Sequence, residues 1–205
     1  MKITRMKVGG FAANCYLLMD EETKEAAVID PGSCPGKIVS SLEGYRVKYI
    51  LLTHAHFDHF AALLDVQKET GALVAMHEDA ADAVNDPERN VSKMFGRDLP
   101  PIHTDVRLKD GDTLSVGNLT IRVLSTPGHS AGGCCYLCKD VLFTGDTLFR
   151  LEVGRTDFAD GSYPTLCKSL QKLAALPGDY RVLPGHDEET TLQYERDHNP
   201  YFYGD

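Results

Sequence analysis

The chain has 205 residues, of which 42% are hydrophobic and 25% charged, and its formal net charge is -9. A chain of this length buries about 70% of the surface that it exposes when unfolded, so one core can form without disulfides. The acidic balance argues against a nucleic-acid partner, which would need a basic stripe on the protein. No apolar run approaches the ~20 residues of a membrane span, so we expect no membrane partner.

The first half of the chain alternates short apolar runs with helical patterns. Charges between Lys2 and Lys7 fall where an export signal would be apolar, so we expect a cytoplasmic protein. Apolar runs bounded by turn residues predict the strands Ile3–Val8, Cys15–Met19, Ala26–Ile29, Tyr49–Thr53, Leu73–Met76 and Val106–Leu108. Helical spacing predicts the helices Lys37–Leu42, Phe60–Thr70 and Asp79–Val84, and Gly71 is a stop signal for the second.

One long segment, from Asp86 to Asp105, has no clear pattern and contains Pro87, Pro100 and Pro101. Connections of this length are uncommon in compact domains and are often functional. We expect this segment to form a wall of the substrate cleft. The alternative is a plain surface excursion.

The second half predicts four more strands and two helices. The strands are Leu119–Ser125, Cys134–Cys138, Val141–Thr144 and Tyr180–Leu183. The helices are Tyr163–Leu176, which Pro177 and Gly178 end, and Glu188–Arg196. No repeat or flexible linker divides the chain, so we expect one domain over residues 1–205.

The six cysteines do not have the pattern of a zinc ribbon, because no second pair follows Cys135 and Cys138. In a strand with a period of two, Cys134 and Cys138 share one face and Cys135 points to the other. We therefore expect buried thiols in a reducing compartment.

Seven histidine and aspartate side chains fall in four short blocks, each directly after an apolar, β-prone run. The blocks are Thr53–His59, Pro127–Ser130, Phe143–Thr147 and Leu183–Asp187, and the seven residues are His54, His56, Asp58, His59, His129, Asp146 and His186. Imidazole and carboxylate suit Zn²⁺, Fe²⁺ or Mn²⁺, and one carboxylate can bridge two ions about 3.5–4 Å apart. Seven ligands with one bridge are the number that two ions need.

Each residue taken alone has a plainer interpretation. Asp58 is a candidate cap for a helix that starts at Phe60, and Asp146 is a candidate turn residue after Gly145. The dense His-x-His-x-Asp-His block together with three further strand-end ligands favours a metal site. A donor set without thiolate leaves positions for water, which indicates hydrolysis or oxygen chemistry rather than a structural ion.

These blocks, in this order, resemble the metallo-β-lactamase superfamily over nearly the whole chain. The stretches Thr144–Phe149, Gly154–Phe158 and Tyr194–Pro200 resemble the short, glyoxalase II-like hydrolases, and the first two also resemble persulfide dioxygenases. The resemblance implies an α/β fold of the αββα type. It also implies a small-molecule substrate.

The resemblance further assigns the ligands. His54, His56 and His129 would hold one ion, Asp58, His59 and His186 the other, and Asp146 would bridge them. Two Zn²⁺ ions are expected, with Fe²⁺ or Mn²⁺ as alternatives, and a hydroxide between them would attack the substrate. Asp58 and Asp146 are the carboxylates expected to take part in catalysis.

Two further positions follow from the resemblance. Asp30, in an Asp-Pro-Gly turn, would orient the first block, although an ordinary turn aspartate is the alternative. Arg155 corresponds to a cationic residue that binds glutathione in glyoxalase II, and an internal ion pair with Asp157 or Asp160 is the alternative. His77, His103 and His198 match no ligand block and are expected to have surface or local hydrogen-bonding roles.

The expected function is hydrolysis of a thioester, by analogy an S-2-hydroxyacyl thiol such as S-lactoylglutathione. The chain ends soon after His186, so we expect no C-terminal helical glutathione-binding domain. The alternative is a mononuclear iron persulfide dioxygenase, whose ligands would be His54, His129 and Asp146. A non-catalytic scaffold would be expected to have lost ligands, and this chain has all seven.

Overall fold

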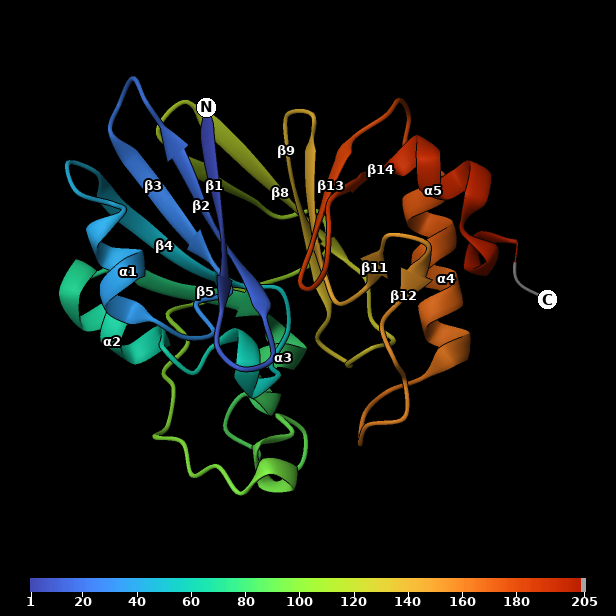
Figure 1. Cartoon of the computed structure of the whole chain (residues 1–205), viewed down its shortest axis with the longest axis horizontal. Coiled ribbons are helices and arrows are strands. Elements are labelled where there is room, and N and C mark those ends of the chain that lie inside the picture. Colours follow the sequence, from blue (N-terminus) through green and yellow to red (C-terminus); the bar gives the residue numbers. More distant parts are fainter. Residues whose placement is uncertain (204–205) are drawn as a thin grey trace.

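The computed structural model describes residues 1–203, which form two six-stranded sheets packed face to face and a small hairpin (Figure 1). The first sheet has the order β1 (Lys2–Val8), β2 (Ala13–Asp20), β3 (Glu25–Ile29), β4 (Arg46–Leu52), β5 (Leu73–His77), β6 (Val106–Leu108). Its first three strands are antiparallel and its last four run parallel. The carboxyl ends of β3 and β4 therefore lie at one edge of the sheet, where the first ligand block begins.

The second sheet has the order β14 (Thr190–Thr191), β13 (Arg181–Pro184), β10 (Val141–Gly145), β9 (Cys134–Cys138), β8 (Leu119–Ser125), β7 (Thr113–Val116). Only β10 and β13 pair in parallel, with Phe143 opposite Leu183. The loops after these two strands consequently leave the sheet side by side. They carry the third and fourth ligand blocks.

Helices cover the outer face of each sheet, which completes the predicted αββα arrangement in a single domain (Figure 1). The first sheet is covered by α1 (Pro35–Ser40), α2 (Leu63–Thr70) and α3 (Glu78–Ala83), and the second by α4 (Tyr163–Ala174) and α5 (Leu192–His198). Three short 3-10 turns are η1 (Phe57–His59), η2 (Ser92–Phe95) and η3 (Pro200–Phe202), and the small hairpin is β11 (Leu148–Phe149) with β12 (Glu152–Val153).

Apolar side chains fill the space between the layers. One cluster lies between the two sheets, and two others lie between a sheet and its helices. Cys134 and Cys138 belong to the cluster between the sheets and Cys135 to the cluster under α4, as the period of two predicts. Among residues 1–203 every cysteine is unpaired, and no helix there is long and apolar enough to span a membrane.

Two predicted helices begin later than expected. The helix predicted from Phe60 begins at Leu63, because η1 and a further turn come first and carry Asp58 and His59. The helix predicted from Glu188 begins at Leu192, because residues 190–191 form β14 beside β13. The Thr191 hydroxyl then accepts a hydrogen bond from the Tyr194 amide and caps α5.

Candidate metal centre

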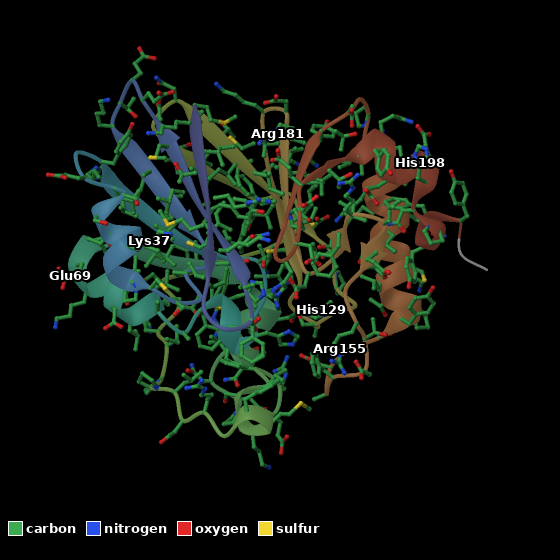
Figure 2. The ribbon with its side chains drawn as sticks, viewed as in Figure 1. Lys37, Glu69, His129, Arg155, Arg181 and His198 are labelled. Atoms are coloured by element: carbon green, nitrogen blue, oxygen red, sulfur yellow. The ribbon has the colours of Figure 1, made fainter. Side chains whose placement is uncertain are left out.

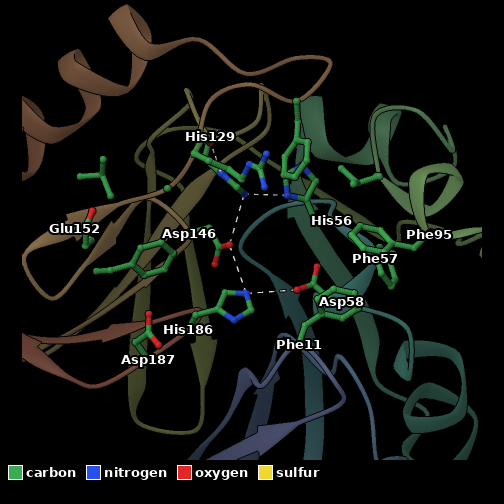
Figure 3. A pocket seen from close by; sticks show the side chains of 16 residues that line it. Phe11, His56, Phe57, Asp58, Phe95, His129, Asp146, Glu152, His186 and Asp187 are labelled. Atoms are coloured by element: carbon green, nitrogen blue, oxygen red, sulfur yellow. Dashed lines mark hydrogen bonds and ion pairs between the residues drawn. The ribbon is translucent and has the colours of Figure 1, made fainter.

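The seven predicted ligands meet where the edges of the two sheets join, although they are spread over more than 130 residues of sequence. Five of them, His56, Asp58, His129, Asp146 and His186, line one cleft (Figure 3), and His54 and His59 are buried beside them. The first block follows β4 and continues through η1, whereas His129 follows β8. Asp146 follows β10 and His186 follows β13, the parallel pair. The cleft thus collects ligands from both sheets.

Six of these residues form two groups of three, and His54 and His59 also form a third group with Asp30. In each group, one ligand atom per residue lies within 4.8 Å of the others: His54, His56 and His129 form one group, and Asp58, His59 and His186 the other. His129 Nε2 lies 2.8 Å from His56 Nδ1 in the first group. His59 Nε2 lies 3.2 Å from His186 Nε2 in the second. These groups are the same as the two ligand sets that the resemblance implied.

Asp146 lies between the two groups. Its Oδ2 is 3.6 Å from Nε2 of His129 and 3.6 Å from Nε2 of His186, and its Oδ1 is 3.4 Å from His59 Nε2. One carboxylate therefore contacts both groups, as a bridging ligand would.

The donor atoms fit a metal ion better than they fit one another. His54 Nε2, His56 Nε2 and Asp146 Oδ1 are buried and have no hydrogen-bond partner among the described residues. A buried polar atom without a partner is costly, and an ion bound here would satisfy His54 Nε2 and Asp146 Oδ1. At His56 the nitrogen that faces His129 is Nδ1. Burial and the neighbouring histidines also hold the pKa of His54 and His56 well below the usual range, which favours the neutral, metal-binding imidazole.

The second group has the opposite electrostatics before an ion binds. Burial lowers the pKa of His59, but the carboxylates of Asp146 and Asp58 outweigh burial and raise that pKa to about 10. Burial raises the pKa of Asp58, and the nearby His59 and His186 reverse this effect, so the Asp58 pKa falls below its usual range. An ion entering this group would displace the His59 proton.

Asp30 supports the first block from β3, as the resemblance implied. Its carboxylate accepts hydrogen bonds from the Thr53 amide at 2.8 Å and the Thr53 hydroxyl at 2.7 Å. Its Oδ2 also lies 3.1 Å from Nδ1 of His59, which leaves His59 Nε2 facing the centre. Asp30 is 1% exposed and has a positive φ of 53°, so it is more than an ordinary surface turn residue.

His129 is held by a main-chain contact. Its Nδ1 lies 2.7 Å from the carbonyl oxygen of Arg155, which can only accept, so the proton is on Nδ1 and Nε2 is free to bind an ion. The Arg155 guanidinium itself pairs with Asp157 at 2.6 Å and lies 4.4 Å from the centre of the Phe158 ring. The internal ion pair, the alternative for this residue, is therefore present, although Arg155 also lines the cleft.

The cleft has a volume of about 550 Å³ and two unlike walls (Figure 3). Phe11, Phe57 and Phe95 form one wall, which we call the aromatic wall; their ring centres are 4.9 to 5.4 Å apart. On the other side lie the acidic Glu152 and Asp187.

The sequence predicts part of the aromatic wall. Phe95 and the neighbouring Val91 bring part of the predicted 86–105 segment into the cleft lining. The sequence reasoning missed Phe11 and Phe57. The only sequence signals for them were that Phe11 follows Gly9 and Gly10 and that Phe57 lies inside the first ligand block.

The remaining histidines lie outside the two groups, as predicted. His77 Nδ1 accepts a hydrogen bond from the Asp79 amide at the start of α3, and His103 is exposed beside Asp105. His198 hydrogen-bonds to the Tyr194 carbonyl on α5, far from the labelled His129 and Arg155 (Figure 2). Asp187 also lines the cleft, and α5 begins only at Leu192.

A cluster of five histidines and two aspartates at the edge of two sheets defines a metal-binding protein of the αββα class. The chain belongs to the metallo-beta-lactamase superfamily, whose sequence description it matches over residues 8–186. It is 36% identical over 210 residues to the probable metallo-hydrolase YqgX of Bacillus subtilis, with 100% of this chain and 99% of that protein covered. It is 34% identical over 212 residues to the hydroxyacylglutathione hydrolase GloC of Haemophilus influenzae, with 98% of each covered.

Solved structures show the same fold. The BLEG-1 B3 metallo-beta-lactamase superposes with a TM-score of 0.92 at 35% identity, over 99% of this chain and 100% of that one. TTHA1623, solved in a di-iron-bound form, superposes with a TM-score of 0.85 at 32% identity, over 97% of this chain and 100% of that one. The fold is thus shared with metal-binding proteins along the full length of this chain.

Proposed function

We propose that this protein is a binuclear metal-dependent hydrolase of thioesters. The observation that carries the proposal is the place of Asp146 between two separate groups of three ligands, which provides for two ions with a shared carboxylate. The similarity to GloC along nearly the whole chain supports the thioester as the bond that is cleaved.

The ligand groups determine what each residue would do. His54, His56 and His129 would hold one ion and Asp58, His59 and His186 the other, with Asp146 bound to both. Two Zn²⁺ ions suit this donor set, and Fe²⁺ or Mn²⁺ are possible substitutes. Ions bound here would supply a water of lowered pKa as the nucleophile and an electrophilic contact for the thioester carbonyl.

The chain's own groups would orient the reaction. Asp58 is ionised and lines the cleft, so its free acceptor oxygen is available to orient the attacking water. The aromatic wall excludes solvent from one side of the centre and offers an apolar surface to the acyl group.

The substrate that we propose is an S-2-hydroxyacyl thiol, of which S-lactoylglutathione is the first to test. Arg155 lies at the cleft with its guanidinium exposed, and exchange of its Asp157 partner for a substrate carboxylate would let it bind the thiol part. We also propose a cytoplasmic location, which suits a chain whose described cysteines are all unpaired.

A second candidate is an iron-dependent persulfide dioxygenase with His54, His129 and Asp146 as the ligands of one ion. Its support is the resemblance of residues 144–149 and 154–158 to persulfide dioxygenases, which the short hydrolases share. The di-iron-bound form of TTHA1623 shows only that a relative of this fold can hold iron. In that reaction the second ligand group would stay without a catalytic role.

One experiment separates the two candidates. Protein purified without added metal is analysed for metal content, then assayed with S-lactoylglutathione and, in an oxygen electrode, with glutathione persulfide. About two ions per chain with thioester cleavage and no oxygen uptake is the expected result. About one iron with oxygen uptake would establish the dioxygenase instead, and turnover of a β-lactam without thioester cleavage would contradict both.

A further inference from the structure

A buried carboxylate lies behind the cleft, on α5. Glu195 is 0% exposed, and among the described residues it forms no ion pair with a lysine, arginine or histidine. Burying a charge without an opposite charge is costly, so such a group persists only where hydrogen bonds satisfy it. None of the proposed reaction steps uses this residue.

Three donors satisfy the Glu195 carboxylate. The Leu151 amide donates to Oε2 at 2.8 Å, and the Thr190 hydroxyl donates to Oε1 at 2.6 Å. The Asn199 side-chain amide donates to Oε2 at 2.8 Å and also contacts the Glu152 carbonyl at 3.2 Å. Asn199 is likewise 0% exposed. Both buried side chains thus bind the main chain of the β11–β12 hairpin.

The bound part of the hairpin is its turn, which needs support. Leu151 has a φ of 61°, a left-handed conformation that a leucine rarely adopts. Without Glu195, the Leu151 amide would lose the acceptor that fixes this conformation. The clamp formed by Glu195 and Asn199 therefore determines where the turn sits.

The two ends of the same hairpin lie at the metal centre. One residue separates Asp146 from the start of β11. The Arg155 carbonyl, which follows β12, accepts a hydrogen bond from Nδ1 of His129. Gly154 packs so closely that a Cβ there would lie 1.8 Å from the Asp146 carbonyl oxygen and 3.0 Å from Cγ of His129. A shift of the hairpin would consequently displace both Asp146 and His129.

We propose that Glu195, with Asn199, is a positioning residue that holds His129 and Asp146 through the β11–β12 hairpin. The hairpin makes no hydrogen bond to Asp58, His59 or His186 among residues 1–203, and its one ring contact with them is that of Phe149 with His186, whose ring centres are 6.2 Å apart. Asp146 is shared by both groups, whereas His129 belongs to the first group alone. Loss of the clamp should therefore weaken the ion of the first group, which depends on both residues, more than the ion of the second. This inference rests on the metal-binding part of the proposed function and not on the substrate.

The first test is a Co²⁺ titration of metal-free protein, followed by visible absorption. Glu195→Ala should weaken one of the two Co²⁺ sites about tenfold or more and change the other less than about threefold. Glu195→Gln should stay close to wild type, because its amide oxygen can still accept from Leu151 and its NH2 group can donate to the Thr190 hydroxyl. Glu189→Gln is the matched control, since this exposed carboxylate pairs with Arg181 on the surface.

The second test needs no metal. Hydrogen exchange of the metal-free protein should be faster at the Leu151 amide and across β11–β12 in Glu195→Ala, by about tenfold or more, and unchanged in β4. If Glu195→Ala does not fold, Asn199→Ala serves instead and should show smaller changes in the same direction.

The outcomes separate this inference from the proposed function. Equal weakening of both Co²⁺ sites, or wild-type Co²⁺ binding in a folded Glu195→Ala protein, would overturn the positioning role. A wild-type protein that binds no Co²⁺ would overturn the metal-site proposal together with this inference. Failure to cleave thioesters would count against the proposed substrate alone, because neither readout involves turnover.

Discussion

Arg89 and Asp160, which are 71 positions apart in the sequence, form an ion pair with Nε and Oδ2 3.2 Å apart. Arg89 belongs to the 86–105 segment, and Asp160 belongs to the loop that follows β12. Both segments contribute residues to the cleft lining. The pair therefore links two segments that line the cleft, the 86–105 segment and the loop after β12.

Removing this pair should loosen substrate binding without changing the chemistry. Arg89→Ala should raise KM for a thioester about three- to tenfold and leave kcat within about twofold, as expected for lost uniform binding. Because both side chains are partly exposed, the loss in free energy of unfolding should stay below about 1 kcal/mol. Steady-state kinetics and urea unfolding measure both, with Arg107→Ala, which breaks the exposed pair with Asp82, as the control. An equal fall in kcat would show that the pair acts on the reaction itself.

Removing the shared carboxylate should abolish activity but not the fold. Asp146→Ala should lower kcat/KM for a thioester by more than about a hundredfold, because both ions lose a ligand. Circular dichroism of the metal-free variant should match wild type, because among the described residues the Asp146 carboxylate makes no hydrogen bond and its contacts with His59, His129 and His186 are 3.4 to 3.6 Å long. Elemental analysis should give fewer ions per chain than wild type, whereas the exposed control Asp197→Ala should keep them. Unchanged turnover would remove Asp146 from the site.

The aromatic wall should select apolar acyl groups. Phe95 is 45% exposed and packs edge-on against Phe11, so Phe95→Ala removes contact area at the cleft with a cost in stability of about 1 kcal/mol. We expect kcat/KM for a hexanoyl thioester to fall about fivefold and for an acetyl thioester to change little. Leu73→Ala, also 45% exposed but remote from the cleft lining, is the matched control. Equal losses of kcat/KM for both substrates would mean that the aromatic wall does not discriminate between acyl groups.

The metal-free protein should be most stable near neutral pH. The pKa of His59 is raised from 6.5 to about 10, so its contribution is complete below pH 6.5 and is lost as the pH rises toward 10. The pKa of His54 and His56 is lowered from 6.5, so their contribution is complete above that pH and is lost as the pH falls. Urea unfolding from about pH 5 to 10 measures this profile. In His59→Gln the alkaline decline should disappear, and its persistence would assign the decline to another group.

Removing the ions should lower thermal stability in a concentration-dependent manner. An ion that binds only the folded state adds about 2.7 kcal/mol at a hundred times its dissociation constant. Melting of wild-type protein with and without a chelator should therefore differ by several degrees, and the difference should grow with added Zn²⁺. A melting temperature that changes with neither the chelator nor Zn²⁺ would contradict a metal site in the native cleft.

The sequence predicts which candidate ligands lie close together because each follows the end of a strand. His186 follows an apolar run that becomes β13, and Asp146 follows one that becomes β10, so parallel pairing brings them together. A strand of two residues, such as Thr190–Thr191, carries too few positions to show a pattern. The helix predicted over that point was therefore wrong at its start.

The cleft walls were less predictable, for a different reason. The contact between Phe11 and Phe95 joins two loops, and their conformations depend on the packed sheets beneath them. The Arg155 side chain had two partners open to it in the sequence, and only the folded loop selects Asp157. Local patterns cannot supply such long-range choices.

The acceptor that orients His129 is a carbonyl of the main chain, not a side chain. Any residue at position 155 except one that distorts the loop offers the same oxygen, so the guanidinium can be replaced without disturbing the imidazole. Position 155 faces the cleft all the same. A protein engineer can therefore vary the charge and size of the group that meets the ligand while the metal centre keeps its support, and natural sequences can drift toward new substrates by the same route.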